Sequence, residues 1–175
     1  MDIVSHALWG GVGFGRSSKR TFALATLIGA LPDAIPFTIP FIGFLWDAIV
    51  TGAVFSPPRP GSGYDGIPEY VFSLYSLTHS LIVFFAVFAL AYVILRRPPW
   101  ILGAWGLHIL MDIFTHSREF FPTPVFWPLS DATFDGVSWG TPSIFIPNLV
   151  FLAGAYAWWW YRARAERALR VREGS

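Results

Sequence analysis

Apolar runs separated by short polar stretches make up most of this chain. The three longest runs cover residues 71–95, 101–116 and 144–161. A helix rises about 1.5 Å per residue, and the hydrocarbon core of a bilayer is roughly 30 Å thick. The first run is long enough to cross that core, the third nearly so, and the second is slightly short. The pattern therefore predicts about three full spanning helices.

Two shorter apolar runs, 3–15 and 21–33, precede these three. Neither is long enough to span alone, so we expect an N-terminal helical hairpin packed inside the bundle. Pro36 and Pro40 then rule out an uninterrupted helix at the start of the segment 34–55. For that segment we predict an extended lead-in, followed by a helix lying at the membrane surface.

The remaining segments are predicted loops and a tail. Residues 56–68 are rich in proline and glycine, which is typical of a loop. Residues 117–143 contain FFPTPVFWPLSD and GVSWGTP, and we expect this aromatic, proline-rich loop to fold as an outer cap. The predicted fold is therefore an all-α, polytopic integral-membrane helical bundle. Residues 1–161 would form a single membrane-embedded domain, and residues 162–175 a basic cytoplasmic tail.

Composition supports a membrane protein and restricts its metal chemistry. Hydrophobic residues make up 54% of the chain, charged residues only 13%, and the mean hydropathy is +0.53. These values are typical of membrane proteins rather than soluble ones. The chain has no cysteine, which excludes disulfides and thiolate metal sites. Any metal must therefore be held by imidazole and carboxylate groups.

The basic residues predict the orientation of the spanning segments. Ten of the 12 lysines and arginines fall into three groups. These are Arg16, Lys19 and Arg20; Arg96 and Arg97; and Arg162, Arg164, Arg167, Arg170 and Arg172. The positive-inside rule assigns all three groups to the cytoplasm of a bacterial or archaeal inner membrane. Residues 71–95 then run from outside to inside, 101–116 from inside to outside, and 144–161 from outside to inside.

This orientation brings polar residues from distant segments to one depth near the outer face. The hairpin turns at its basic group, so both of its ends point outward. His6, Asp33, His79, Asp112 and His116 then lie near the outer face. A carboxylate within the membrane costs about 2.5–3.5 kcal/mol, and such groups normally have a partner. The shared depth predicts that these side chains form one site.

The segment LHILMDIFTH, residues 107–116, carries the clearest metal-ligand pattern. His108, Asp112 and His116 recur at intervals of four and therefore lie on one face of a helix. Nitrogen and oxygen ligands of this kind suit Zn, Mn or Fe. With the residues at the same depth, the candidate metal ligands are His6, Asp33, His79, His108, Asp112 and His116. Of these, His108 and Asp112 are the strongest candidates and His116 the weakest.

Each candidate also has an ordinary structural interpretation. His108 and Asp112 can form a simple hydrogen-bonded pair inside a bundle. His79 can bond a neighbouring serine, and Asp33 can cap a helix. His116 can interact favourably with a helix dipole. The metal hypothesis depends on the convergence of all these residues.

Five short motifs in this order resemble the YdjM-like family of membrane-bound metal-dependent hydrolases. They are DIVSHALWG, IGALPD, SLTHSL, LHILMDIFTH and FFPTPVFWPLSD, and they cover the chain from residue 2 to about residue 140. The resemblance implies a small helical membrane protein with a metal site built from His6, Asp33, His79, His108 and Asp112. It also implies a hydrolase activity. Many members of that family have a His-Arg pair shortly before their THS, where this chain has Tyr75 and Ser76.

Together these observations predict a hydrolase that acts on a lipid or lipid-linked phosphoester near the outer face through metal-activated water. Zinc is the first choice of metal, with Mn, Fe or Mg as alternatives. Asp33 and Asp112 are the candidate catalytic residues, because a second carboxylate can act as general base. Ser80 and Arg118 are the candidate substrate-binding residues, and Arg118 would replace the missing family arginine.

A different class of function remains open: a transport, sensing or scaffold protein whose His/Asp cluster is a metal or proton site. The lipid bilayer is the expected partner in either case. We expect no nucleic-acid partner, because the tail arginines follow WWWY at residues 158–161, as in a cytoplasmic tail near anionic lipid.

Overall fold

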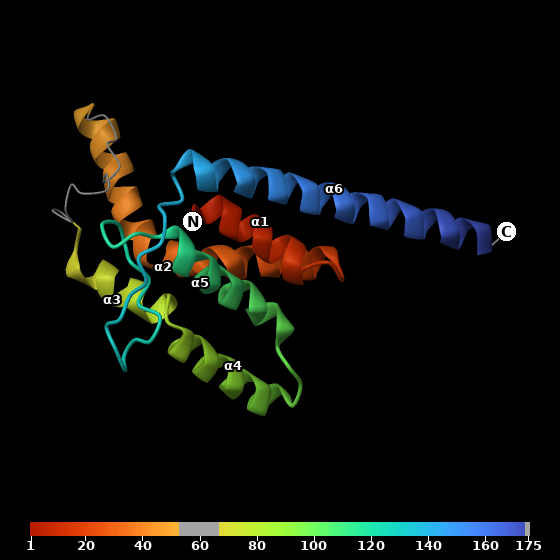
Figure 1. The fold of residues 1–175 in the computed structure, drawn as a ribbon, viewed down its shortest axis with the longest axis horizontal. Coiled ribbons are helices and arrows are strands. Elements are labelled where there is room, and N and C mark those ends of the chain that lie inside the picture. The colour runs from red at the N-terminus through yellow and green to blue at the C-terminus, as the bar shows by residue number, and fades with distance from the viewer. Residues whose placement is uncertain (53–66, 174–175) are drawn as a thin grey trace.

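The computed structural model describes residues 1–52 and 67–173, with side chains to residue 166. Within these ranges all regular secondary structure is helical, which confirms the all-α prediction (Figure 1). The elements are α1 (Ile3–Phe14), α2 (Lys19–Thr51), α3 (Glu69–Thr78), α4 (Leu81–Leu95), the 3-10 turn η1 (Trp100–Leu102), α5 (Gly103–Thr115) and α6 (Pro142–Glu173). Most of the predicted loop 56–68 lies outside the described residues.

Helix α1 packs closely along the first half of α2, as expected for an N-terminal hairpin (Figure 1). Two glycines face each other at the crossing. A Cβ atom on Gly10 would lie 2.6 Å from the carbonyl oxygen of Ala25, and one on Gly29 would lie 2.6 Å from that of His6. Real Cβ atoms do not approach carbonyl oxygens this closely, so the hairpin requires glycine at both positions. The close contact also sets the position of His6 relative to α2.

Gly10→Ala is expected to lower the free energy of unfolding by about 1–3 kcal/mol, the usual cost of overpacking. The added methyl group would have to push α1 away from the backbone of α2. Gly43→Ala is the matched control, because a Cβ atom at Gly43, also in a helix, meets nothing within 4 Å. Denaturant titration followed by circular dichroism in detergent measures both. If both substitutions lowered the free energy of unfolding equally, close packing at Gly10 would not be the cause.

Helix α2 runs unbroken through three prolines, so the predicted extended lead-in and separate surface helix over 34–55 are wrong. A proline removes one backbone hydrogen bond and usually kinks a helix, but it need not end it when the freed carbonyl finds another donor. Pro36 lacks the N–H that would bond the carbonyl of Pro32. The hydroxyl of Thr78 donates to that carbonyl instead, at 2.9 Å. Figure 1 shows that α2 changes direction about half-way along its length.

The predicted single helix over 71–95 is also wrong, because the chain breaks at His79 and Ser80. Helices α3 and α4 meet there at an angle of 56°. Ser80 has an extended backbone, and its hydroxyl accepts hydrogen bonds from the N–H groups of Ile82 at 3.1 Å and Val83 at 3.3 Å. Ser80 is therefore the N-cap of α4. As a result, His79 lies at the break between two helices rather than within one.

The three predicted spanning helices are not confirmed in the part of the chain that the structure describes. There α2 alone is long and apolar enough to cross a membrane, and the bent pair α3 and α4 would make a second span if it counts as one. The break after α3 divides the longest apolar run. Helix α5 has 13 residues, whereas a span needs about 20. Helix α6 runs without interruption through the predicted boundary between residues 161 and 162.

Backbone hydrogen bonds and one buried side chain attach the loop that follows α5, within the predicted cap 117–143, to the helices. Backbone N–H groups of residues 136, 137 and 139 donate to carbonyls of residues 116, 114 and 115, at 2.9, 3.0 and 2.9 Å. These bonds satisfy carbonyls at the C-terminal end of α5 that have no partner within the helix. Phe121 of the same loop packs in a buried cluster with Val71 and Tyr75. The loop thus joins the end of α5 to α3.

Candidate metal centre

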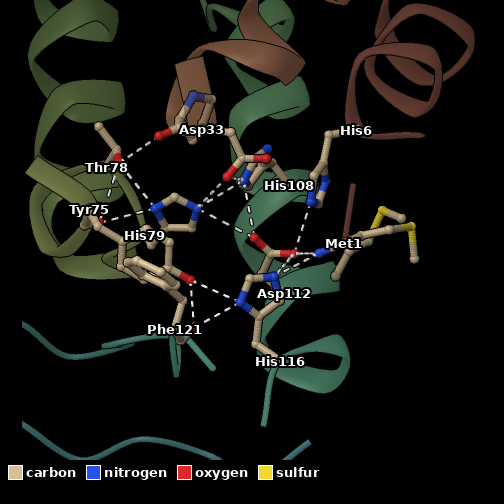
Figure 2. Close-up of polar contacts among 12 residues, drawn as sticks. Met1, His6, Asp33, Tyr75, Thr78, His79, His108, Asp112, His116 and Phe121 are labelled. Carbon is tan, nitrogen blue, oxygen red and sulfur yellow. Dashed lines mark hydrogen bonds and ion pairs between the residues drawn. The ribbon is translucent and has the colours of Figure 1, made fainter. Parts of the chain in front are cut away.

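The six predicted ligands converge on one buried region, although they come from distant parts of the chain (Figure 2). They are His6 of α1, Asp33 of α2, His79 at the break between α3 and α4, His108 and Asp112 of α5, and His116 just after α5. All six side chains are buried. Asp112 lies at the centre of the group (Figure 2).

Four of the six form a compact cage. Asp33, His79, His108 and Asp112 each offer one ligand atom, and these atoms lie within 4.8 Å of one another. His79 Nε2 lies 3.0 Å from His108 Nε2, and 3.4 Å from both Asp33 Oδ1 and Asp112 Oδ2. His108 Nε2 lies 3.2 Å from Asp112 Oδ2 and 3.7 Å from Asp33 Oδ1. Ligands held tetrahedrally at about 2.0–2.1 Å from zinc would be separated by about 3.3 Å. The separations given above, 3.0–3.7 Å, are close to that value.

Backbone carbonyls orient the two imidazoles of this cage. His79 Nδ1 lies 3.0 Å from the carbonyl oxygen of Tyr75, and His108 Nδ1 lies 2.7 Å from that of Gly29. A carbonyl can only accept, so each Nδ1 carries the donated proton and each Nε2 keeps its lone pair. Two lone pairs only 3.0 Å apart repel each other unless a cation lies between them. A hydrogen bond from the other ring nitrogen to a backbone carbonyl is typical of metal-bound histidines.

The charge of the cage also favours a cation. Burying a carboxylate is costly unless it is paired. Among the described residues no lysine or arginine pairs with Asp33 or Asp112, although the Met1 nitrogen contacts Asp112 Oδ1. Asp112 Oδ2 accepts no hydrogen bond there. The residues Asp33, His79, His108 and Asp112 can therefore hold a metal ion.

The other two histidines face the opposite oxygen of Asp112. His6 Nε2 lies 2.8 Å and His116 Nε2 lies 3.5 Å from Asp112 Oδ1. His116 donates through Nδ1 to the carbonyl of Phe121 at 2.7 Å, so its Nε2 also points a lone pair at the site. The structure thus brings His6 and His116 to Asp112, but not into the four-residue cage.

Two further residues, Thr78 and Tyr75, support the histidines. The Thr78 hydroxyl, which donates to the carbonyl of Pro32, lies 3.0 Å from His79 Nδ1. Tyr75 donates to the carbonyl of Phe121 at 2.8 Å, and its ring stacks on His79 with centroids 3.8 Å apart. Both are polar side chains within the apolar run 71–95. The sequence alone did not show their partners in α2 and in the loop after α5.

Thr78→Val is expected to lower the free energy of unfolding by about 1–3 kcal/mol, because valine leaves the buried carbonyl of Pro32 without a donor. Metal affinity should also fall, since the contact beside His79 Nδ1 is lost. Thr51→Val is the control: Thr51 is exposed, and its hydroxyl donates at 2.7 Å to the carbonyl of Asp47 in its own helix. Thermal unfolding and metal titration measure both variants. Equal losses in the two variants would contradict a specific role for Thr78.

The two predicted substrate-binding residues occupy different surroundings. Ser80 is fully buried; besides capping α4, its hydroxyl donates to the carbonyl of Trp127 at 2.5 Å. Arg118 lies exposed in the loop, and its backbone N–H donates to Asp135 Oδ1 at 2.9 Å. The hydrogen bonds of Ser80 are therefore structural ones, whereas the side chain of Arg118 lies at the surface. Substrate binding by either residue stays a prediction.

A cavity of about 530 Å³ adjoins the centre, within the size range of small-molecule sites. Its wall is mainly apolar and aromatic, and it comes from the second half of α2, the start of α1 and the loop after α5. The lining side chains include Phe37, Phe41, Phe44, Ile67, Phe120, Phe121 and Trp139. Asp33 and His116 also form part of the wall. A molecule in the cavity would therefore contact both apolar side chains and the polar centre.

Comparisons of the chain with protein-family models, with curated proteins and with solved structures each find no match.

Proposed function

We propose that this chain is an integral-membrane, metal-dependent hydrolase that acts on a lipid or lipid-linked phosphoester near the outer face of a bacterial or archaeal inner membrane. The observation that carries the proposal is the buried cage of Asp33, His79, His108 and Asp112. Zinc suits the two nitrogens and two oxygens, and Mn, Fe or Mg are alternatives. The resemblance to the YdjM-like family points the same way.

Each residue of the cage has a role in this proposal. A divalent ion held there would polarise a phosphoryl oxygen and activate water for attack. His79 and His108 keep their Nε2 lone pairs toward the ion through the bonds to backbone carbonyls. Asp33 lies in the cavity wall, so its carboxylate is the one in position to accept a proton from attacking water. Asp112 contacts all four histidines of the centre and so fixes their relative positions.

The apolar surroundings support a lipid substrate and a membrane location. A phosphoester at the centre would place its hydrocarbon part against the aromatic wall of the cavity. Large apolar side chains cover the outside of three helices: Ile49 of α2 is 80% exposed, Ile94 of α4 68%, and Phe151 of α6 67%. Apolar surface of this extent marks a membrane or a protein interface. In the proposed orientation the basic C-terminal tail is cytoplasmic.

A non-enzymatic metal or proton site is the second candidate function. The observation in its favour is the distance of 3.0 Å between His79 Nε2 and His108 Nε2, which a shared proton would also bridge. In that case the cluster would relay protons or sense metal, and the protein would hydrolyse no phosphoester.

Metal analysis and a phosphoester screen of the purified protein separate the two functions. We expect stoichiometric divalent metal, and hydrolysis of lipid phosphoesters that His79→Ala abolishes. Asp131→Asn, in the exposed part of the loop, is the control and should leave both unchanged. Protein that purifies without metal, takes none up on titration and hydrolyses no lipid phosphoester would overturn the hydrolase proposal.

A further inference from the structure

Both oxygens of the Asp112 carboxylate contact histidines. Its Oδ2 faces the cage, with His108 Nε2 at 3.2 Å and His79 Nε2 at 3.4 Å. Its Oδ1 faces His6 Nε2 at 2.8 Å and His116 Nε2 at 3.5 Å. The Met1 amino nitrogen also contacts Oδ1 and lies 3.0 Å from His116 Nε2. The distances on the Oδ1 side are thus similar to those of the cage itself. One carboxylate therefore presents each oxygen to its own pair of imidazole nitrogens.

The rings of His6 and His108 stack in parallel, with centroids 3.5 Å apart and planes 19° apart. Each ring directs its Nε2 at a different oxygen of Asp112. The Nδ1 atom of His6 is buried and has no hydrogen-bond partner among the described residues. His6 thus makes its polar contact through Nε2, with Asp112 Oδ1. Because the two rings are stacked, the Nε2 atoms of His6 and His108 lie side by side and do not surround a single metal position.

We propose that the centre holds two divalent cations, bridged by the carboxylate of Asp112. The first cation would occupy the cage, and the second would be bound by His6, His116 and Asp112 Oδ1, where it would displace the Met1 amino group. Bridged pairs of this kind in hydrolytic sites lie about 3.5–4 Å apart. This inference rests on the metal site of the proposed function, and it adds a second position to that site.

The cavity provides an independent observation, because it reaches both positions. Its wall includes Asp33, a ligand of the first position, and His116, a ligand of the second. A ligand in the cavity would therefore meet both cations. Among titratable side chains, Asp2 also borders the cavity, but its carboxylate already accepts hydrogen bonds from the N–H and hydroxyl of Ser5 at 2.9 and 2.6 Å.

Charge balance favours a phosphoester as that ligand. Two divalent cations carry four positive charges, and Asp33 and Asp112 supply two negative ones. With the Met1 ammonium group displaced from Asp112, two positive charges remain. A phosphomonoester dianion would neutralise them, as would a phosphodiester monoanion together with hydroxide. A neutral carboxyl ester would leave the buried charge uncompensated, which is costly. The two-cation centre therefore selects anionic phosphoesters.

Titration of metal-free protein with Mn²⁺ tests the inference without any assay of activity. Elemental analysis should find two Mn²⁺ per chain, and electron paramagnetic resonance should show the spectrum of an exchange-coupled pair. His116→Gln should bind one Mn²⁺ and give an uncoupled spectrum. Glutamine can still donate to the carbonyl of Phe121, and circular dichroism checks that the helices remain. His79→Ala should likewise bind one, at the second position.

Four results would overturn the inference. One Mn²⁺ in the wild type, with His116→Gln unchanged, would mean a single site in the cage and would leave the proposed function intact. Loss of all metal in a folded His116→Gln protein would mean one site that includes His116. Two Mn²⁺ with no coupling would mean separate, unbridged sites. A protein that binds no Mn²⁺ would contradict the two-cation centre. If it also bound no other metal, that result would count against the proposed function as well.

Discussion

Asp112→Asn is expected to abolish stoichiometric metal binding while the helices stay folded. Asparagine keeps the size and shape of the side chain but removes the negative charge, and its amide nitrogen presents hydrogens where a ligand oxygen stood. Changing even a residue that only hydrogen-bonds a metal ligand lowers the affinity for the metal by about 10–100-fold. Because Asp112 contacts four histidines, we expect a loss of more than about a hundredfold.

Metal titration followed by elemental analysis measures this loss, and circular dichroism reports the fold. Asp135→Asn is the matched control, an exposed carboxylate in the loop that accepts one backbone hydrogen bond from Arg118. It should bind metal as the wild type does. An Asp112→Asn protein that is folded and still binds metal with wild-type affinity would show that Asp112 is a structural partner of the histidines and not a ligand.

Removal of metal with a chelator is expected to lower the Tm of the wild-type protein by about 10 °C. A ligand present at about 1,000 times its Kd stabilises the folded state by about 4 kcal/mol, and 1 kcal/mol corresponds to about 2–4 °C for a chain of this length. The physical reason is that the metal-free state keeps two buried carboxylates and two opposed imidazole lone pairs without their cation. The direction is therefore destabilising.

Thermal unfolding in detergent, with and without chelator, measures the shift. Restoring the metal to the chelated protein should restore the Tm. The Asp112→Asn variant is the control, because a protein that binds no metal should show no response to chelator. A wild-type Tm that chelator leaves unchanged, in protein verified to have lost its metal, would contradict a structural contribution of the ion.

Helix formation and the identity of the polar residues were predictable because both depend on local sequence. Apolar runs form helices in a chain with this composition, and all regular secondary structure of the described residues is indeed helical. His108 and Asp112 lie four apart on α5, so a helix alone brings them together. The absence of cysteine limited the ligands to imidazole and carboxylate.

Where the helices end was less predictable, because tertiary contacts decided it. Pro36 would break α2 if the carbonyl of Pro32 had no donor, but Thr78, more than forty residues later, supplies one. The run 71–95 is apolar enough for one helix, yet Ser80 caps a new one and its hydroxyl bonds the loop at Trp127. Neither partner is visible in a window of local sequence.

The sequence by itself determined the helical class, the chemistry of the ligands and the expectation that distant polar residues meet at one depth. Only the tertiary structure decided how they meet. It placed His79 at a break between helices, and it turned the two oxygens of Asp112 toward different histidine pairs. The physical reason is that residue spacing along a helix sets which side chains share a face. The distances between faces depend instead on close packing, such as that of Gly10 against α2, and on which carbonyls and imidazoles find partners across the bundle.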